Sequence, residues 1–95
     1  MPSMKRPSHP GRVLKNLYLT PSELTPYKLS DLIGVPRTRI NRLVNEQTEV
    51  SIDTAIRLAK FFGTSPEYWL NMQTNFNLSQ AKVDVSNIEP LAMAG

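Results

Sequence analysis

The chain has no cysteine, which excludes disulfides and metal sites built on thiolates. A single histidine, His9, is too few for a metal site. No apolar run reaches the roughly 18 residues of a membrane-spanning helix, and the N-terminal sequence MPSMKRPSHPGR lacks the apolar stretch of a signal peptide. We therefore expect a cytosolic protein that binds no metal, no cofactor and no membrane.

The sequence also lacks the groupings on which catalysis depends. A nucleophile with a nearby base, paired carboxylates in a cleft or a glycine-rich phosphate loop would each leave a pattern, and none is present. His9 precedes Pro10 at an expected helix start, where its side chain can cap the helix. We expect the chain not to be an enzyme.

Charge is modest overall but unevenly placed. The net charge of the 95 residues is +3. Residues 1–45 carry eight basic and two acidic side chains, whereas residues 46–95 carry three basic and six acidic ones. This asymmetry fits a chain that binds a polyanion with one half and a protein with the other, and an ordinary solvated surface is the alternative.

Residues 26–45, PYKLSDLIGVPRTRINRLVN, have the pattern of a helix-turn-helix. Ser30 is small where the two helices cross, and Gly34 lies at the corner, where the backbone usually needs positive φ. Apolar residues occupy the positions that face the core, namely Leu29, Ile33, Val35, Ile40 and Leu43. These constraints together predict a helix up to Gly34 and a second helix from about Arg37 to Asn45.

The second of these helices has two distinct faces. At about 100° per residue, Ile40, Leu43 and Val44 fall in one sector and should face the core. The opposite side carries hydroxyl, carboxamide and guanidinium groups, from Thr38, Asn41, Arg42 and Asn45, with Arg37 and Arg39 flanking it. Such groups recognise base edges and phosphates in duplex DNA, although a merely solvated face is the alternative.

The remaining segments predict an all-α fold with five helices in residues 9–79, between a flexible basic arm at 1–8 and a tail at 80–95. The first helix should run from His9 or Pro10 to about Leu19 and bury Val13, Leu14 and Leu17. The helix from Ile52 to about Phe62 should bury Ile52, Ala55, Ile56, Ala59 and Phe62. The last helix carries Trp69, Met72 and Phe76 at helical spacing, which is typical of core or interface.

The tail alternates Val83 and Val85 with polar residues, which permits a short strand. Five helices already satisfy a domain of this length. We hypothesise that the tail lies across a partner subunit rather than across its own chain.

Several segments resemble a known family. HPGRVL at 9–14, GVPRTRIN at 34–41, DTAIRLAKFFGTSPEYWLNMQ at 53–73 and NFNL at 75–78 are similar to the HigA-type antitoxins, a family of Xre-type (phage-repressor-like) helix-turn-helix proteins. The resemblance implies a homodimer that binds an inverted-repeat operator in double-stranded DNA and represses its own operon. It also implies neutralisation of a cognate HigB-type toxin, an mRNA endonuclease.

The resemblance also implies roles for individual residues. Base contacts would come from Arg37, Thr38, Asn41 and Arg42. Phosphate contacts would come from free backbone N–H groups at the start of the second helix and from Thr25, Tyr27, Lys28, Arg39 and Asn45. The dimer interface would come from Trp69, Met72 and Phe76.

The sequence departs from the family pattern in three ways, at Arg12, at Pro36 and in the loop NEQTEV at 45–50. Arg12 stands where glutamate is usual after HPG, and Pro36 stands near a helix start where serine or threonine is frequent. Glu46 and Glu49 lie in a loop that usually holds phosphate-binding residues. These acids support an alternative in which the fold is a protein-interaction module that does not bind DNA. A second alternative is a solitary Xre-type regulator without a toxin.

Overall fold

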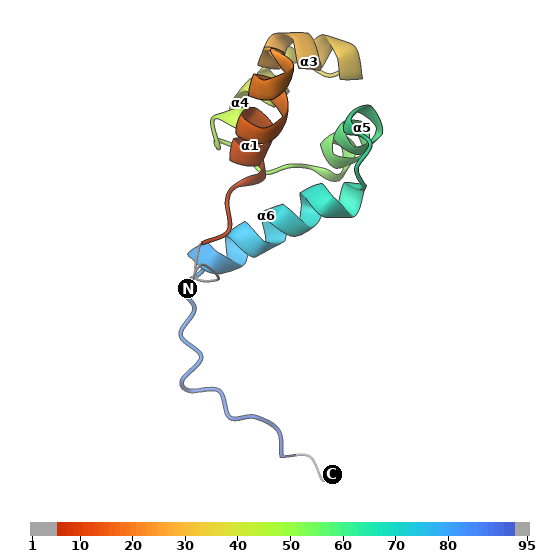
Figure 1. The fold of residues 1–95 in the computed structure, drawn as a ribbon. Helices are drawn as coiled ribbons and strands as arrows, with labels where there is room; N and C mark the ends of the chain where they lie inside the picture. The colour runs from red at the N-terminus through yellow and green to blue at the C-terminus, as the bar shows by residue number, and fades with distance from the viewer. Residues whose placement is uncertain (1–5, 93–95) are drawn as a thin grey trace.

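The structure, a computed structural model, describes residues 6–92 as a bundle of helices followed by an extended tail (Figure 1). The described residues contain no strand. In chain order the helical segments are α1 (Pro10–Val13), η2 (Leu14–Leu19), α2 (Thr20–Ser22), α3 (Pro26–Ile33), α4 (Arg37–Val44), α5 (Ile52–Phe62) and α6 (Pro66–Gln80). The predicted all-α fold is confirmed, with α1, η2 and α2 forming one continuous first helix.

The first helix is longer than predicted, and it changes its hydrogen-bond register along its length. Segment η2 is a π-helix, in which the N–H of Thr20 donates to the carbonyl of Lys15, five residues earlier. The helix continues past Pro21 and ends at Glu23, which adopts φ 57°. The wider turn also moves Leu17 to the surface, where 64% of it is exposed, so its predicted burial is wrong. Leu19 takes its place in the core.

Side-chain caps and left-handed residues fix the helix ends. The hydroxyl groups of Thr25 and Ser51 accept hydrogen bonds from the first turns of α3 and α5, as the sequence predicts for N-caps. Gly34 ends α3 at φ 75°, which confirms the predicted corner of the helix-turn-helix. A residue with a side chain would be strained in this conformation.

The core is formed by side chains of η2, α3, α4, α5 and α6 and fixes the position of α4. Leu29, Ile40, Leu43 and Trp69 are almost completely buried. Gly11 of α1 lies directly against the backbone of α4, since a Cβ atom at this position would be 1.7 Å from the carbonyl oxygen of Leu43. The close approach of α1 supports α4 from behind and leaves its other face open.

One predicted core face is partly wrong. In α5, Ile52 is 66% exposed and Ile56 is 52% exposed, whereas Ala55 and Ala59 are buried as predicted. The rest of the domain covers a face centred on Ala55 and Leu58 instead. Ala55 and Ala59 border both the predicted stripe, with Ile52 and Ile56, and the observed stripe, with Leu58. Periodicity alone therefore did not show which of the two stripes is buried.

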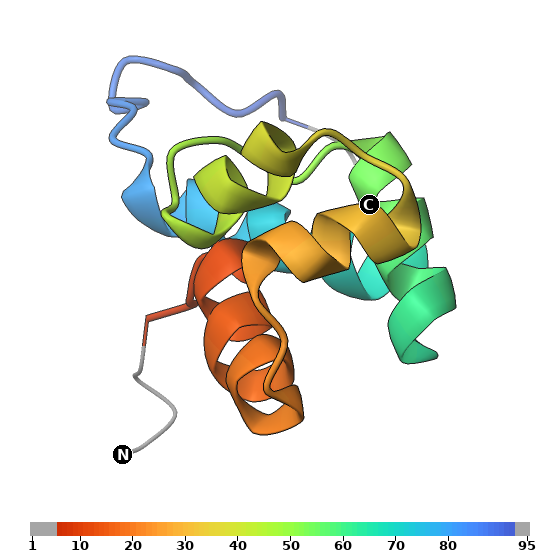
Figure 2. The same cartoon turned by 90° about the horizontal axis from the view of Figure 1, so that it is seen from above.

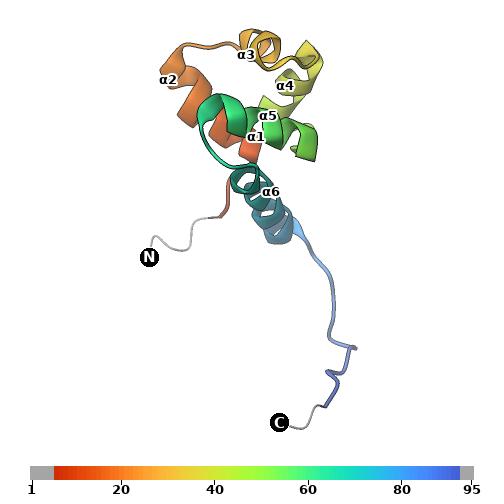
Figure 3. The ribbon, with the colours of Figure 1, turned by 90° about the vertical axis from the view of Figure 1, so that its right-hand side faces the viewer.

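The ends of the described chain lie far from the helix-turn-helix. Viewed from the side, α3 and α4 lie at one end of the molecule, and α6 and the tail lie at the other (Figure 3). Residues 81–92 form no strand and are exposed throughout. Most of the predicted arm, residues 1–5, lies outside the described part of the chain. Between residues 6 and 92, no helix has the length and apolar character needed to cross a membrane.

Candidate nucleic-acid interface

Helix α4 lies at the surface, beside α3, when the molecule is viewed from above (Figure 2). Its core face is as predicted, because Ile40, Leu43 and Val44 are buried. The opposite face presents Thr38 and Arg42 to solvent, with Asn45 at its end and Asn41 half-buried at its edge. The predicted base-contacting residues therefore lie on one accessible surface.

Arg37, at the start of α4, lies across the helix-turn-helix towards α3. Its Nη2 atom is 3.4 Å from a carboxylate oxygen of Asp31, and its guanidinium lies 5.3 Å from the ring centroid of Tyr27. Both contacts are exposed, so they orient the arginine more than they stabilise the fold. They bring Tyr27, a predicted phosphate-contacting residue, next to the base-contacting face.

Arg39 is held by α5. The carboxylate of Asp53 accepts hydrogen bonds from Arg39 and, at 3.1 Å, from Nε of Arg57. These bonds, the one from Arg39 first, hold the pKa of the Asp53 carboxyl below its usual range. A DNA phosphate would therefore have to compete with Asp53 for the guanidinium of Arg39.

Arg57 joins α5 to the turn of the helix-turn-helix. Its Nη1 atom donates to the carbonyl oxygen of Ile33 at 2.8 Å and lies 3.5 Å from that of Gly34. The carbonyl of Ile33 belongs to the last turn of α3, where no N–H of the same helix is placed to donate to it. The sequence analysis missed Asp53 and Arg57 as a unit, although their spacing of four residues on a helix was a signal for an ion pair.

The start of α3 offers fewer free amides than expected. The hydroxyl of Thr25 accepts a hydrogen bond from the backbone N–H of Lys28 at 3.0 Å, and Pro26 has no N–H. The amide of Tyr27 is thus the one left in the first turn that has no partner among residues 6–92. The side chains of Tyr27 and Lys28 are exposed beside it.

The acidic loop after α4 is largely engaged with the rest of the domain. Glu46 adopts φ 59°, and its carboxylate lies 3.6 Å from Nε of Arg12. Glu49 accepts a hydrogen bond of 3.1 Å from the amide of Asn77. Two departures from the family pattern, Arg12 and Glu46, therefore neutralise each other.

Pro36 and His9 occupy helix starts. Pro36 adopts extended backbone before α4 and supplies no side-chain cap, as its chemistry dictates. His9 caps α1 as predicted, since its Nδ1 atom accepts a hydrogen bond of 2.9 Å from the amide of Gly11. Burial lowers the pKa of His9, and the nearby charge of Glu46 offsets part of this effect.

The residues predicted for a dimer interface are not equally accessible. Trp69 is completely buried, and its Nε1 atom donates to the hydroxyl of Thr64 at 2.8 Å. A contact of its side chain with a second chain does not fit this burial, because Trp69 already fills the core of its own chain. Met72 and Phe76 are partly buried and remain candidates. The part of the chain that the structure describes contains no cluster of side chains suited to a metal ion.

Comparison with known proteins agrees with this geometry. Residues 14–69 match the family model described as Helix-turn-helix. The chain is 41% identical over 80 residues to virulence-associated protein I of Dichelobacter nodosus, covering 84% of this chain and 74% of that protein.

Several solved structures are similar to this one, and two of them are antitoxins solved with DNA. The antitoxin HigA of Pseudomonas aeruginosa, solved with the higBA promoter, is 36% identical, with a TM-score of 0.76 over 78% of this chain and 80% of that one. The antitoxin GraA in complex with its operator is 31% identical, with a TM-score of 0.83 over 94% of this chain and 95% of that one. The chain therefore belongs to the helix-turn-helix family, among the Xre-type DNA-binding regulators to which the HigA antitoxins are related.

Proposed function

We propose that this protein is a sequence-specific repressor that binds an inverted-repeat operator as a homodimer, with α4 of each copy in a major groove. One observation carries the proposal: α4 buries its apolar side in its own domain and leaves Thr38, Arg42 and Asn45 exposed on the other. A two-fold dimer would place its two α4 helices in major grooves about 34 Å apart. The similar antitoxins were solved with a promoter or an operator, which supports operator binding by this chain.

In this proposal Arg37, Thr38, Asn41 and Arg42 contact bases. Guanidinium groups pair with guanine, and the carboxamide of Asn41 pairs with adenine. Lys28 and the amide of Tyr27 contact the phosphates, together with Thr25, Asn45 and Arg39. Arg39 contributes least among the basic groups, since Asp53 already occupies its guanidinium.

Replacing Arg42 tests the base-contacting face. Arg42→Ala should weaken operator binding by roughly 1 to 3 kcal/mol and relax the preference at one base pair. Lys28→Ala should instead weaken binding to all sequences and flatten the dependence on salt. Lys15→Ala removes the same charge from an exposed position on the first helix and serves as the control.

Gel shifts at two salt concentrations provide the measurement. If Arg42→Ala left affinity and specificity at the level of Lys15→Ala, the assigned face would be wrong. If the unmodified chain retarded no DNA even at low salt, the chain would be a protein-interaction module and not a repressor.

We further propose that the protein is the antitoxin of a HigB/HigA-type pair, represses its own operon and neutralises a HigB-type mRNA endonuclease. Similarity to HigA and GraA over most of the chain supports this role. The test is the adjoining gene: a small basic reading frame there should arrest growth when expressed alone, and co-expression of this chain should restore growth. A lone gene, or a neighbour whose effect this chain does not relieve, would leave a solitary regulator.

A further inference from the structure

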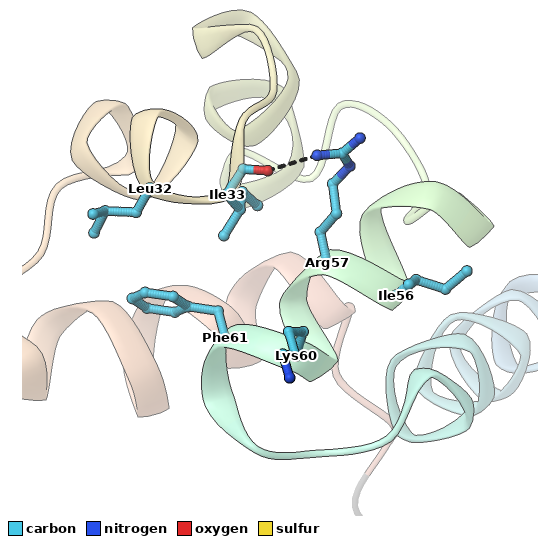
Figure 4. Close-up of a pocket in the computed structure, with 6 residues that line it drawn as sticks. All are labelled: Leu32, Ile33, Ile56, Arg57, Lys60 and Phe61. Carbon is cyan, nitrogen blue, oxygen red and sulfur yellow. Dashed lines mark hydrogen bonds between the residues drawn. The ribbon is translucent and has the colours of Figure 1, made fainter.

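The end of α3 and the outer face of α5 enclose an apolar pocket that the DNA-binding proposal does not use (Figure 4). The pocket has a volume of about 370 Å³ and is lined by Leu32, Ile33, Ile56, Arg57, Lys60 and Phe61. Three of the lining side chains are large, apolar and substantially exposed: 48% of Leu32, 52% of Ile56 and 41% of Phe61. Apolar groups gathered around a hollow in this way mark a site of association.

The polar groups of the pocket are cationic. The guanidinium of Arg57 is bound by Asp53 and by the carbonyl of Ile33, so its charge is partly compensated. Lys60 forms no ion pair with any other side chain between residues 6 and 92. An apolar hollow beside a free ammonium group suits an apolar segment that carries a carboxylate.

The C-terminal tail, residues 81–92, has this composition. Its apolar side chains have no cover, with 76% of Val83, 57% of Val85, 68% of Ile88 and 81% of Leu91 exposed. It also carries two acids, Asp84 and Glu89, against one base, Lys82. A turn is already formed within it, since the N–H of Ile88 donates to the carbonyl of Val85 at 3.0 Å.

The tail of the same chain is poorly placed to fill this pocket. It leaves the far end of α6 and runs away from the helices (Figures 1 and 3). To return, it would have to run back along the 15 residues of α6, about 22 Å, and then continue to α3. Ile88 lies eight residues beyond Gln80 and reaches at most about 28 Å when fully extended, which the turn at Val85 prevents.

We propose that residues 83–91 of one copy dock in the α3/α5 pocket of a second copy, with their acidic side chains near Lys60. The exchange is reciprocal in a two-fold dimer, so both tails and both pockets are covered. The inference rests on the homodimer of the proposed function and adds a contact between its two copies.

Cross-linking between two singly substituted chains tests the exchange, because the natural chain has no cysteine. Chains carrying Leu32→Cys, which keeps Lys60, and chains carrying Asn87→Cys are mixed and treated with a short bis-maleimide. A covalent dimer well above the yield with Lys15→Cys in place of Leu32→Cys is the expected result. No excess over that control would overturn the proposal. So would a chain with both substitutions that cross-links mainly within itself, since its own tail would then fill the pocket.

A charge placed in the pocket gives an independent measurement. Ile56→Glu should repel the acidic tail and raise the dimer dissociation constant at least about tenfold, by sedimentation equilibrium. Ile52→Glu makes the same change four residues earlier on α5, outside the lining, and should have a much smaller effect. Equal effects of the two substitutions would contradict docking in the pocket.

Operator binding separates this inference from the proposed function. Cross-linking without any DNA binding would refute the repressor and leave the tail exchange standing. Operator binding as a dimer without cross-linking would refute the tail exchange and leave the repressor standing.

Discussion

Arg57 should hold the turn of the helix-turn-helix, and Arg57→Ala is the change that tests this. The side chain crosses from α5 to the end of α3, where Nη1 lies 2.8 Å from the carbonyl oxygen of Ile33 (Figure 4). Its Nε atom also contacts Asp53, which in turn binds Arg39 of α4. Removing this side chain therefore breaks the link from α5 to the end of α3 and leaves Asp53 without one of the two arginines that hold it beside α4.

The hydrogen bond from Arg57 to Ile33 sets how much Arg57→Ala should lower the free energy of unfolding. A hydrogen bond from a charged donor contributes about 1.5 to 3 kcal/mol when buried. Because 43% of the Arg57 side chain is exposed, we expect solvent to reduce this to about 1 kcal/mol. The ion pair with Asp53 lies in solvent and adds little. For a domain of this size the melting temperature should fall by roughly 4 to 8 °C.

Thermal unfolding followed by circular dichroism measures this change. Lys15→Ala is the control, because it removes an exposed cation that lies outside the α3/α5 pocket and whose side chain donates no hydrogen bond within residues 6–92. Operator affinity should also fall for Arg57→Ala at temperatures where both variants are folded, since α4 is less firmly placed. If Arg57→Ala melted at the temperature of Lys15→Ala and bound the operator equally well, the role assigned to Arg57 would be refuted.

Two further predictions concern the first helix. Gly11→Ala should lower the free energy of unfolding by at least about 2 kcal/mol, because the new Cβ atom would meet the rigid backbone carbonyl of Leu43. The control Gly63→Ala places its Cβ where no atom lies within 4 Å, so it should lower the free energy of unfolding by only about 1 kcal/mol, through backbone strain. If denaturant unfolding showed Gly11→Ala to be the milder change, the packing of Gly11 against Leu43 would be contradicted. The lowered pKa of His9 means that the folded chain takes up a proton less readily than the unfolded chain, so stability should be complete above about pH 6.5 and decrease below it. His9→Asn keeps a capping acceptor without this titration, so its loss of unfolding free energy between about pH 7.5 and 5.5 should be smaller than that of the unmodified chain, and equal losses would count against the argument.

The helix-turn-helix itself was predictable because its constraints are local. A small residue at the crossing, a glycine at the corner and apolar residues at helical spacing each reflect the geometry of neighbouring turns. Gly34, Ser30 and the buried side of α4 follow directly from these rules. For the same reason the exposed side of α4, with Thr38 and Arg42, could be named from the sequence.

Contacts between distant segments could not be derived in this way. The stripe of α5 that is buried depends on where α3 and α6 pack, which left Ile52 and Ile56 exposed. The pairing of Arg12 with Glu46 joins residues on different elements, and no periodicity along the chain relates them.

The sequence by itself thus determined which helices form and which face of α4 is exposed, since these depend on spacing over a few residues. Only the tertiary structure decided that Trp69 belongs to the core, that Asp53 and Arg57 hold the turn, and that α3 and α5 leave a pocket open. These features arise from the distances between elements that are far apart along the chain, and side-chain periodicity does not record such distances.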